Sequence, residues 1–173
     1  HAGAATEGTP LLGAEPSPEF EERVREEIAK VESFYAEKCS EFGAQIELLR
    51  EQVGSLRAQM PPSKSQEGSI QQALRTLYRD VRLLENYTIL NYTALIKICK
   101  KHDKVLRRSA SVRLHPNITR AHFARAERVH ELERDIEVVY ASAFCGDERR
   151  VARSHLLLKM SNNQTDNSNG RSK

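Results

Sequence analysis

The chain has 173 residues, a length that suits about one domain, or a small domain with tails. Apolar residues make up 39% of it and charged residues 29%, and Trp is absent, which favours solvated helices over a barrel or a doubly wound sheet. Uninterrupted apolar runs are only a few residues long, as at Leu156 to Leu158, whereas a membrane-spanning helix needs about 20. We therefore expect an all-α protein in which this chain has no membrane span.

Cysteine usage and motif content bear on the compartment and on catalysis. Cys39, Cys99 and Cys145 are odd in number and far apart, so they form neither a disulfide framework nor a CxxC metal site, and a reducing, cytoplasmic location is favoured. The sequence contains no G-x-x-x-x-G-K-[ST], G-x-S-x-G or H-E-x-x-H motif, and its histidines do not fall at metal-binding spacing. We expect no catalytic residue, no metal and no cofactor.

Charge is divided unevenly along the chain. Between Glu15 and Glu51 there are eleven acidic residues against five basic ones, a net charge of −6. Between Lys97 and Arg113 there are seven basic residues against Asp103 alone, a net charge of +6. Because the whole chain carries only +3, this dense local cation indicates a discrete anion site rather than a general polyanion binder.

Apolar residues recur every three or four positions along most of the chain, which predicts helices. Residues 1–18 are rich in Gly and Pro and indicate a flexible leader. From 20 to 60 the period holds for about forty residues, which predicts a helix of about 60 Å. Pro61 and Pro62 end this helix, and 63–69 is expected to be a polar turn.

A second helix is predicted where the period resumes at 70–88, and the short connection favours antiparallel packing on the first helix. Asn91 is a candidate N-cap for a new helix over 92–107. The segment 109–118 contains Pro116 and is expected to be a loop.

Two more helices are expected in the rest of the chain. One runs from 123 to near Gly146, and GDERRVARSHLLL then begins a short basic helix. The tail from 161 has no apolar residue. The predicted organisation is a flexible leader (1–18), a helical core (19–108), a C-terminal helical extension (109–160) and a disordered tail (161–173).

The segment NYTALIKICKKHDKVLRR (91–108) has the clearest functional signal. At 100° per residue it gathers four lysines on one face: Lys97, Lys100, Lys101 and Lys104. Like charges at this spacing repel by ~0.2–0.5 kcal/mol per pair, and Asp103 is expected to relieve part of this as the i,i+3 partner of Lys100. A multivalent anion would remove the remaining repulsion. A purely solvated helix face is the alternative interpretation, and nucleic-acid binding lacks the usual aromatic or groove-reading motif.

The other side of this helix is expected to pack into the core. It contains Leu95, Ile98, Cys99, His102, Val105 and Leu106. Because His102 lies among these apolar residues, it is interpreted as a hydrogen-bonded core histidine rather than as a base or a ligand.

Two segments resemble the SPX domain family. NYTALIKICKKHDKVL is similar to the K-I-x-K-K-x-D-K helix of these domains, and EFEERVREEIAKVESFYAEKCSEF is similar to their E-L-x-K-V-x-x-F-Y-x-x-K signature. The resemblance covers roughly 19–106. A weaker similarity through HFARAERVHELERDIEVVYASAFCGDERRVARSHL resembles the region after the SPX core in SPX-EXS phosphate exporters.

The resemblance implies a fold, a ligand and a site. The fold would be a long antiparallel helical hairpin or three-helix bundle, and the ligand an inositol polyphosphate or inositol pyrophosphate that reports phosphate status. Lys101 matches the lysine of the family's phosphate-binding cluster, and Lys97, Lys100 and Lys104 match the adjoining lysine surface. The implied protein is a cytoplasmic, non-enzymatic sensor that regulates a membrane exporter domain of the same parent chain.

The sequence departs from the family at its amino end. SPX domains begin with a helical hairpin that supplies a Tyr and a Lys to the phosphate cluster, and no such hairpin is present here. Either the chain is an excerpt that omits the hairpin, or the protein has lost half of its site, and the start at His1 rather than Met favours the excerpt. Without the hairpin, part of an apolar surface is expected to be exposed. The alternative from another functional class is a coiled-coil interaction module that pairs through the long first helix and binds no small molecule.

Overall fold

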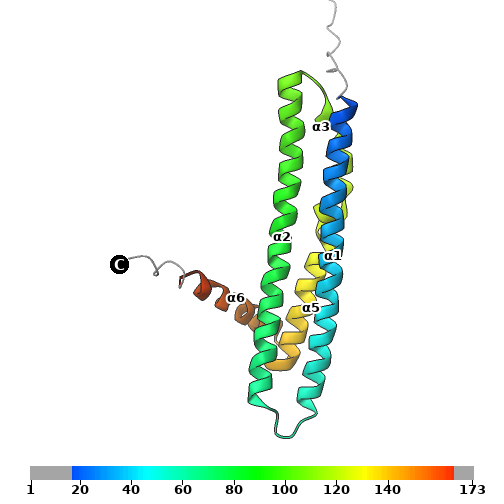
Figure 1. Cartoon of the computed structure of the whole chain (residues 1–173). Coiled ribbons are helices and arrows are strands. Elements are labelled where there is room, and N and C mark those ends of the chain that lie inside the picture. The colour runs from blue at the N-terminus through cyan, green and yellow to red at the C-terminus, as the bar shows by residue number, and fades with distance from the viewer. Residues whose placement is uncertain (1–16, 166–173) are drawn as a thin grey trace, which may run out of the picture.

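The computed structural model of the chain describes residues 17–165, with side chains as far as Leu157. All of its regular elements in this range are helices, so the all-α prediction is confirmed. α1 (Pro18–Arg57) and α2 (Lys64–Leu106) form a long antiparallel pair, and α3 (Ala110–Arg120), α4 (His122–Arg125) and α5 (Glu127–Phe144) return beside that pair as a third column (Figure 1). α6 (Arg149–Thr165) projects sideways from the bundle (Figure 1).

α1 is a continuous helix because its capping, its charge pairs and its apolar spacing agree. The Ser17 hydroxyl accepts a hydrogen bond from the Phe20 amide at 3.3 Å, and Pro18 occupies the first turn, where no amide is needed. Ion pairs one turn apart, such as Lys30 to Glu27 at 2.7 Å, line its exposed face. Its apolar stripe is buried, as the period predicts: Val24, Val31, Tyr35, Cys39, Phe42, Ile46, Leu49, Val53 and Leu56.

The start of α2 corrects the prediction of a polar turn at 63–69. α2 begins at Lys64, and the Ser63 hydroxyl accepts a hydrogen bond from the Gln66 amide at 3.4 Å. Ser63 is therefore the N-cap, and the polar residues that suggested a turn form the first turns of the helix.

The helix also continues past Asn91, so the predicted new helix at 92–107 is wrong as a separate element. The Asn91 side chain donates a hydrogen bond to the Tyr87 carbonyl one turn earlier at 2.8 Å, which is the behaviour of an interior residue rather than a cap. Thr88 and Leu95 are buried on either side of it, so one apolar stripe runs through this position.

Pro116 does not prevent a helix where a loop was expected at 109–118. α3 includes Pro116, and Leu114 and Ile118 are buried to 1% and 0% exposure. The carbonyl that loses its amide partner belongs to Val112, which is exposed, so water can replace that partner. Burial of one helix face therefore outweighs the missing bond.

The helix expected over 123–146 is divided at Ala126, which has φ of 51°. The Glu32 carboxylate of α1 accepts hydrogen bonds from the amides of His122 and Phe123 at 3.0 and 3.1 Å, and Phe123 is fully buried. α1 thereby fixes the start of α4, and the chain turns at Ala126 to enter α5. The predicted end of this segment near Gly146 is confirmed, since α5 ends at Phe144 and Gly146 has φ of 57°.

α6 packs on α5 and α2 through a small apolar face and one buried carboxylate. Ala152 and Leu156 are fully buried. Glu137 of α5 is only 6% exposed; it accepts a hydrogen bond from the Tyr78 hydroxyl of α2 at 3.2 Å and pairs with Arg149 of α6 at 3.0 Å. These partners satisfy a carboxylate that would otherwise be costly to bury.

The structure describes only part of the leader and the tail that the sequence predicts. Residues 161–165 lie in α6, whereas the leader 1–16 and the tail 166–173 lie outside the described residues. Within the described part, no helix combines the length and the apolar character that crossing a bilayer requires.

Candidate anion-binding surface

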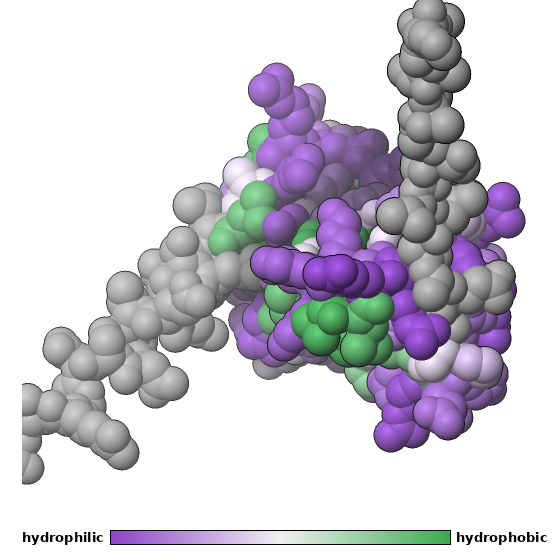
Figure 2. Space-filling model, turned by 90° about the horizontal axis from the view of Figure 1, so that it is seen from above, coloured by the Kyte–Doolittle hydropathy of each residue, from purple (hydrophilic) through white to green (hydrophobic). Residues whose placement is uncertain are grey.

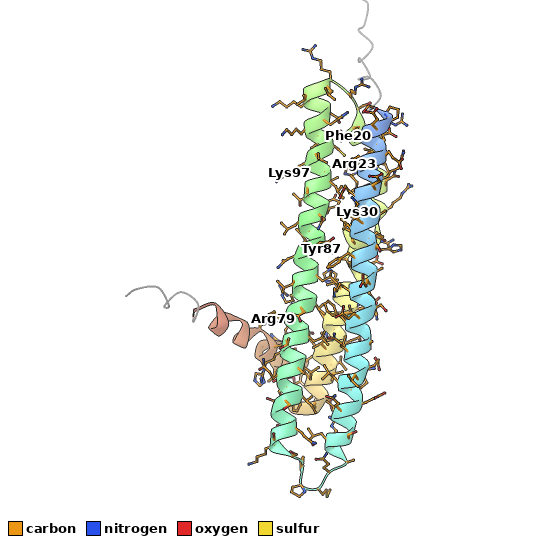
Figure 3. The ribbon with its side chains drawn as sticks, in the orientation of Figure 1. Phe20, Arg23, Lys30, Arg79, Tyr87 and Lys97 are labelled. Atoms are coloured by element: carbon orange, nitrogen blue, oxygen red, sulfur yellow. The ribbon has the colours of Figure 1, made fainter. Side chains whose placement is uncertain are left out.

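The four predicted lysines lie together on the last turns of α2. All four side chains of this lysine stripe (Lys97, Lys100, Lys101 and Lys104) are exposed. Figure 3 places Lys97 on the side of α2 away from α1. Within residues 17–157 none of the four forms an ion pair or a side-chain hydrogen bond. The stripe therefore presents uncompensated positive charge to the solvent.

In the first half of α2, two arginines have acidic partners. Arg79 pairs with Asp80 at 3.1 Å. Arg82 lies 3.8 Å from Glu85 and 3.6 Å from Glu133 of α5. Lys64 and Arg75 of this half have no acidic partner among the described residues, but the four lysines at the end near α3 are the densest group of such cations on α2.

Asp103 is not the partner of Lys100 that its spacing predicts. Its carboxylate accepts hydrogen bonds from the amides of Ala110 at 2.6 Å and Ser111 at 2.9 Å, and from the Ser111 hydroxyl. Burial acts to raise the pKa of Asp103, but these hydrogen bonds outweigh it and hold the pKa below its ordinary value. Asp103 therefore remains ionised and caps α3 instead of neutralising the lysine stripe.

Arg113, another cation of the basic segment 97–113, has an acidic partner on α1. Its Nε lies 3.0 Å from the Glu21 carboxylate, which also pairs with Arg25 at 2.8 Å. Glu21 is buried at 8% exposure. Its pair with Arg113 links the start of α1 to α3. Arg113 thus belongs to a structural pair and not to the lysine stripe.

On the side of α2 opposite the lysine stripe, the burial of the apolar residues agrees only in part with the prediction. Leu95 and Cys99 are buried at 7% and 1% exposure. Ile98, Val105 and Leu106 are 50%, 67% and 54% exposed, so their predicted place in the core is wrong for the described part of the chain. Figure 2 looks down on this end of the bundle and shows a hydrophobic patch surrounded by hydrophilic side chains.

The His102 side chain is only 7% exposed, but its surroundings differ from the prediction of a hydrogen-bonded core histidine. Its ring stacks on Phe20 of α1, with centroids 3.8 Å apart and an angle of 17° between the planes. Neither ring nitrogen has a hydrogen-bond partner among the described residues, and Nδ1 lies 3.6 Å from the Asp103 carboxylate. His102 therefore packs as an aromatic ring that holds this part of α2 against α1.

The four lysines are exposed on α2, away from the largest groove described for this pair of helices. A groove of about 880 Å³ lies between α1 and α2 near their connection, lined by residues such as Leu48, Gly68 and Thr76, at the opposite end of α2 from the lysines. Among the described residues no group of three or more His, Cys, Asp and Glu side chains could hold a metal ion. The arrangement suits a multivalent anion that bridges several ammonium groups.

Sequence reasoning missed the contacts that shape this surface from α1 and α3. Helical spacing does not show that Phe20 stacks on His102. It also pairs Asp103 with Lys100, whereas the carboxylate binds the start of α3. The sequence contains one usable signal, since Ser109 and Ser111 are typical residues of a helix start. A helix predicted to start at Ala110 would have free first-turn amides, and these are natural donors to the Asp103 carboxylate.

Comparison with known proteins identifies relatives of the chain. The SPX domain family matches residues 55–117. SPX and EXS domain-containing protein 1 of Dictyostelium discoideum is 27% identical over 139 residues, which cover 79% of this chain and 15% of that protein. Phosphate transporter PHO1 homolog 4 of Arabidopsis thaliana is 33% identical over 97 residues, or 56% of this chain and 13% of the transporter.

A third relative is named only for its SPX domain. SPX domain-containing protein 4 of Arabidopsis thaliana is 28% identical over 113 residues, which cover 60% of this chain and 36% of that protein. The chain thus spans about a third or less of the length of these three relatives, and none of the three is named as an enzyme.

Proposed function

Residues 55–117 belong to the SPX domain family, and on that premise we propose that this chain is a phosphate-homeostasis sensor that binds inositol polyphosphates or pyrophosphates. The ligand-binding residues in this proposal are Lys97, Lys100, Lys101 and Lys104. The parent protein would be a phosphate exporter, with the sensor on the cytosolic side of the membrane. The PHO1 homologue, which is named as a phosphate transporter, supports the exporter assignment.

The observation that carries the proposal is a set of four exposed lysines on one helix face without an acidic partner in the described part of the chain. Holding like charges together costs stability, and the one carboxylate within the stripe's own helix turns is directed to α3. Each ammonium offers three donors, so phosphate groups arranged around a small ring can contact several lysines at once. This arrangement favours a compact polyphosphate over a single phosphate ion.

Calorimetric titration with inositol hexakisphosphate tests the proposal. Replacing any of the four lysines by Ala should raise Kd roughly two- to tenfold, because each contact is partly exposed to solvent. The melting temperature without ligand should stay equal or rise slightly, since repulsion within the stripe decreases. Lys64→Ala is the matched control, an exposed lysine at the other end of the same helix. Unchanged affinity in all four variants would return the stripe to a solvated helix face.

Lys101 should have the largest effect once the family's amino-terminal hairpin is supplied. In SPX domains a Tyr and a Lys of that hairpin share one phosphate group with the lysine that Lys101 matches. We therefore expect Lys101→Ala to weaken binding more in a hairpin fusion than in the present chain. An equal effect in both proteins would count against this part of the proposal.

The coiled-coil alternative has less support, because the apolar stripe of α1 is used inside the bundle. Val31 and Leu49 of this stripe are 6% and 7% exposed, so they are not available to pair with a second copy. Sedimentation velocity should give a monomer with and without ligand. A nucleic-acid binder would differ in titration, with affinity that falls steeply with salt and little preference among phosphate arrangements.

A further inference from the structure

Asp103 lies among the lysine stripe residues in sequence, but its carboxylate binds the first turn of the next helix. Three donors hold it there: the amides of Ala110 and Ser111, at 2.6 and 2.9 Å, and the Ser111 hydroxyl. The side chain is 18% exposed, so these donors rather than water satisfy most of its acceptor capacity.

The same carboxylate has a second possible partner on its own helix. Lys100 precedes it by three positions, a spacing at which oppositely charged side chains on a helix attract each other. Lys100 forms no ion pair within the described residues, although the pair of Lys38 with Glu41, which has the same order and spacing, forms on α1. The start of α3 and the lysine stripe are therefore alternative partners for one negative charge.

We propose that the first turn of α3 regulates the lysine stripe by holding the Asp103 carboxylate, an internal competitor of the ligand, away from Lys100. This inference rests on the proposed function, since it concerns the same anion site. When α3 is docked, the stripe keeps its full positive charge. When Ala110 and Ser111 release Asp103, its carboxylate pairs with Lys100 and lowers the charge available to a phosphate group.

The coupling works in both directions because binding at the two places is linked. A ligand on Lys100 removes the alternative partner of Asp103 and so favours its bonds to α3. Ligand binding should therefore slow hydrogen exchange at the amides of Ala110 and Ser111. A lysine stripe that acts independently of α3 would leave that exchange unchanged.

A double-mutant comparison separates this coupling from simple loss of structure. Ser111→Ala removes one donor and weakens the hold on Asp103, so Kd for inositol hexakisphosphate should rise about two- to threefold. Asp103→Asn removes the charge but keeps an oxygen that accepts from the α3 amides. Adding Asp103→Asn to Ser111→Ala should therefore restore Kd to the wild-type value or below it.

A serine in α6, distant in sequence from Asp103, provides the control. Ser154→Ala removes a hydroxyl that donates to the Val151 carbonyl in α6, and it should leave Kd unchanged. The inference is overturned if Ser111→Ala leaves Kd unchanged, or if Asp103→Asn fails to restore binding in the double variant. Binding by the wild type with either of these results leaves the proposed function intact. Absence of binding by the wild type overturns the proposed function, and this inference with it.

Discussion

Burial decides the reactivity of the three thiols. Cys99 is 1% exposed, and burial, helped by the nearby Asp103, raises its pKa to about 11. At pH 8 this thiol is protonated and shielded, so iodoacetamide should alkylate the half-buried Cys145 well before Cys99. Peptide mapping after timed labelling measures both rates, and labelling in denaturant provides the fully accessible reference. Equal rates in the native protein would mean that α2 opens near Cys99.

Glu133 is a carboxylate that the fold does not fully satisfy. Burial, followed by repulsion from Glu85, raises its pKa above the ordinary value of 4.5, although Arg82 and His130 oppose this. A raised pKa in the folded state means that the folded protein loses stability relative to the unfolded chain as pH rises through that range.

Glu133→Gln should therefore raise the melting temperature at pH 7, and its advantage should shrink as pH falls toward 4.5. Thermal melts at several pH values measure this difference. Glu131→Gln is the control, because Glu131 is exposed in a one-turn pair with Arg128 and its substitution should change little. A Glu133→Gln variant that is less stable at neutral pH would mean that the Arg82 pair outweighs the cost of burial.

At the scale of elements, the continuity of α2 makes opposite predictions for two polar residues. Ser63→Ala removes the N-cap and should cost about 1 kcal/mol, or ~2–4 °C in melting temperature. Asn91→Ala replaces an interior residue by a better helix former and should leave stability equal or up to ~0.7 kcal/mol higher. Thermal melts of the two variants check both values. A loss at Asn91 as large as that at Ser63 would indicate a helix start there.

The sequence predicts the helices well where one apolar stripe continues, and poorly where a local signal competes with it. Pro116 signalled a loop, but Leu114 and Ile118 on the buried face keep α3 helical. The start of α4 had no local signal, because the Glu32 carboxylate that accepts from its amides is far away in the sequence. Local periodicity cannot identify a cap supplied by another helix.

The candidate site shows the same division. The exposure of all four lysines follows from helical spacing alone, so it could be predicted. The orientation of Asp103 depends on where α3 begins, and the exposure of Ile98 and Val105 depends on which elements cover α2. Both are tertiary properties that a single helical wheel does not contain.

At the scale of the whole molecule, α2 exposes apolar side chains beside the lysine stripe. Leu90, Ile98 and Val105 are 69%, 50% and 67% exposed. An SPX-type helical hairpin fused ahead of this chain should cover part of this surface and raise the melting temperature by several degrees, since each kcal/mol is worth ~2–4 °C. Thermal melts of the chain with and without the hairpin measure the gain.

The double substitution Ile98→Ser and Val105→Ser provides the control for this prediction. It should change the melting temperature of the present chain little, because both side chains already contact water. It should remove most of the gain produced by the hairpin. An unchanged melting temperature after fusion would show that the hairpin does not pack here.

The unbroken course of α2 has a mechanical consequence. One end of this helix presents the lysine stripe, and about 35 Å away Tyr78 contacts the carboxylate that holds α6. A 43-residue helix without a break has no joint between these two places, so it behaves as a stiff lever. If α2 tilts as a rigid body, its lysine end and the end that contacts α6 both move. They move in opposite directions when the tilt is about the middle of the helix. The lysine stripe and the contact that holds α6 thus belong to one continuous helix.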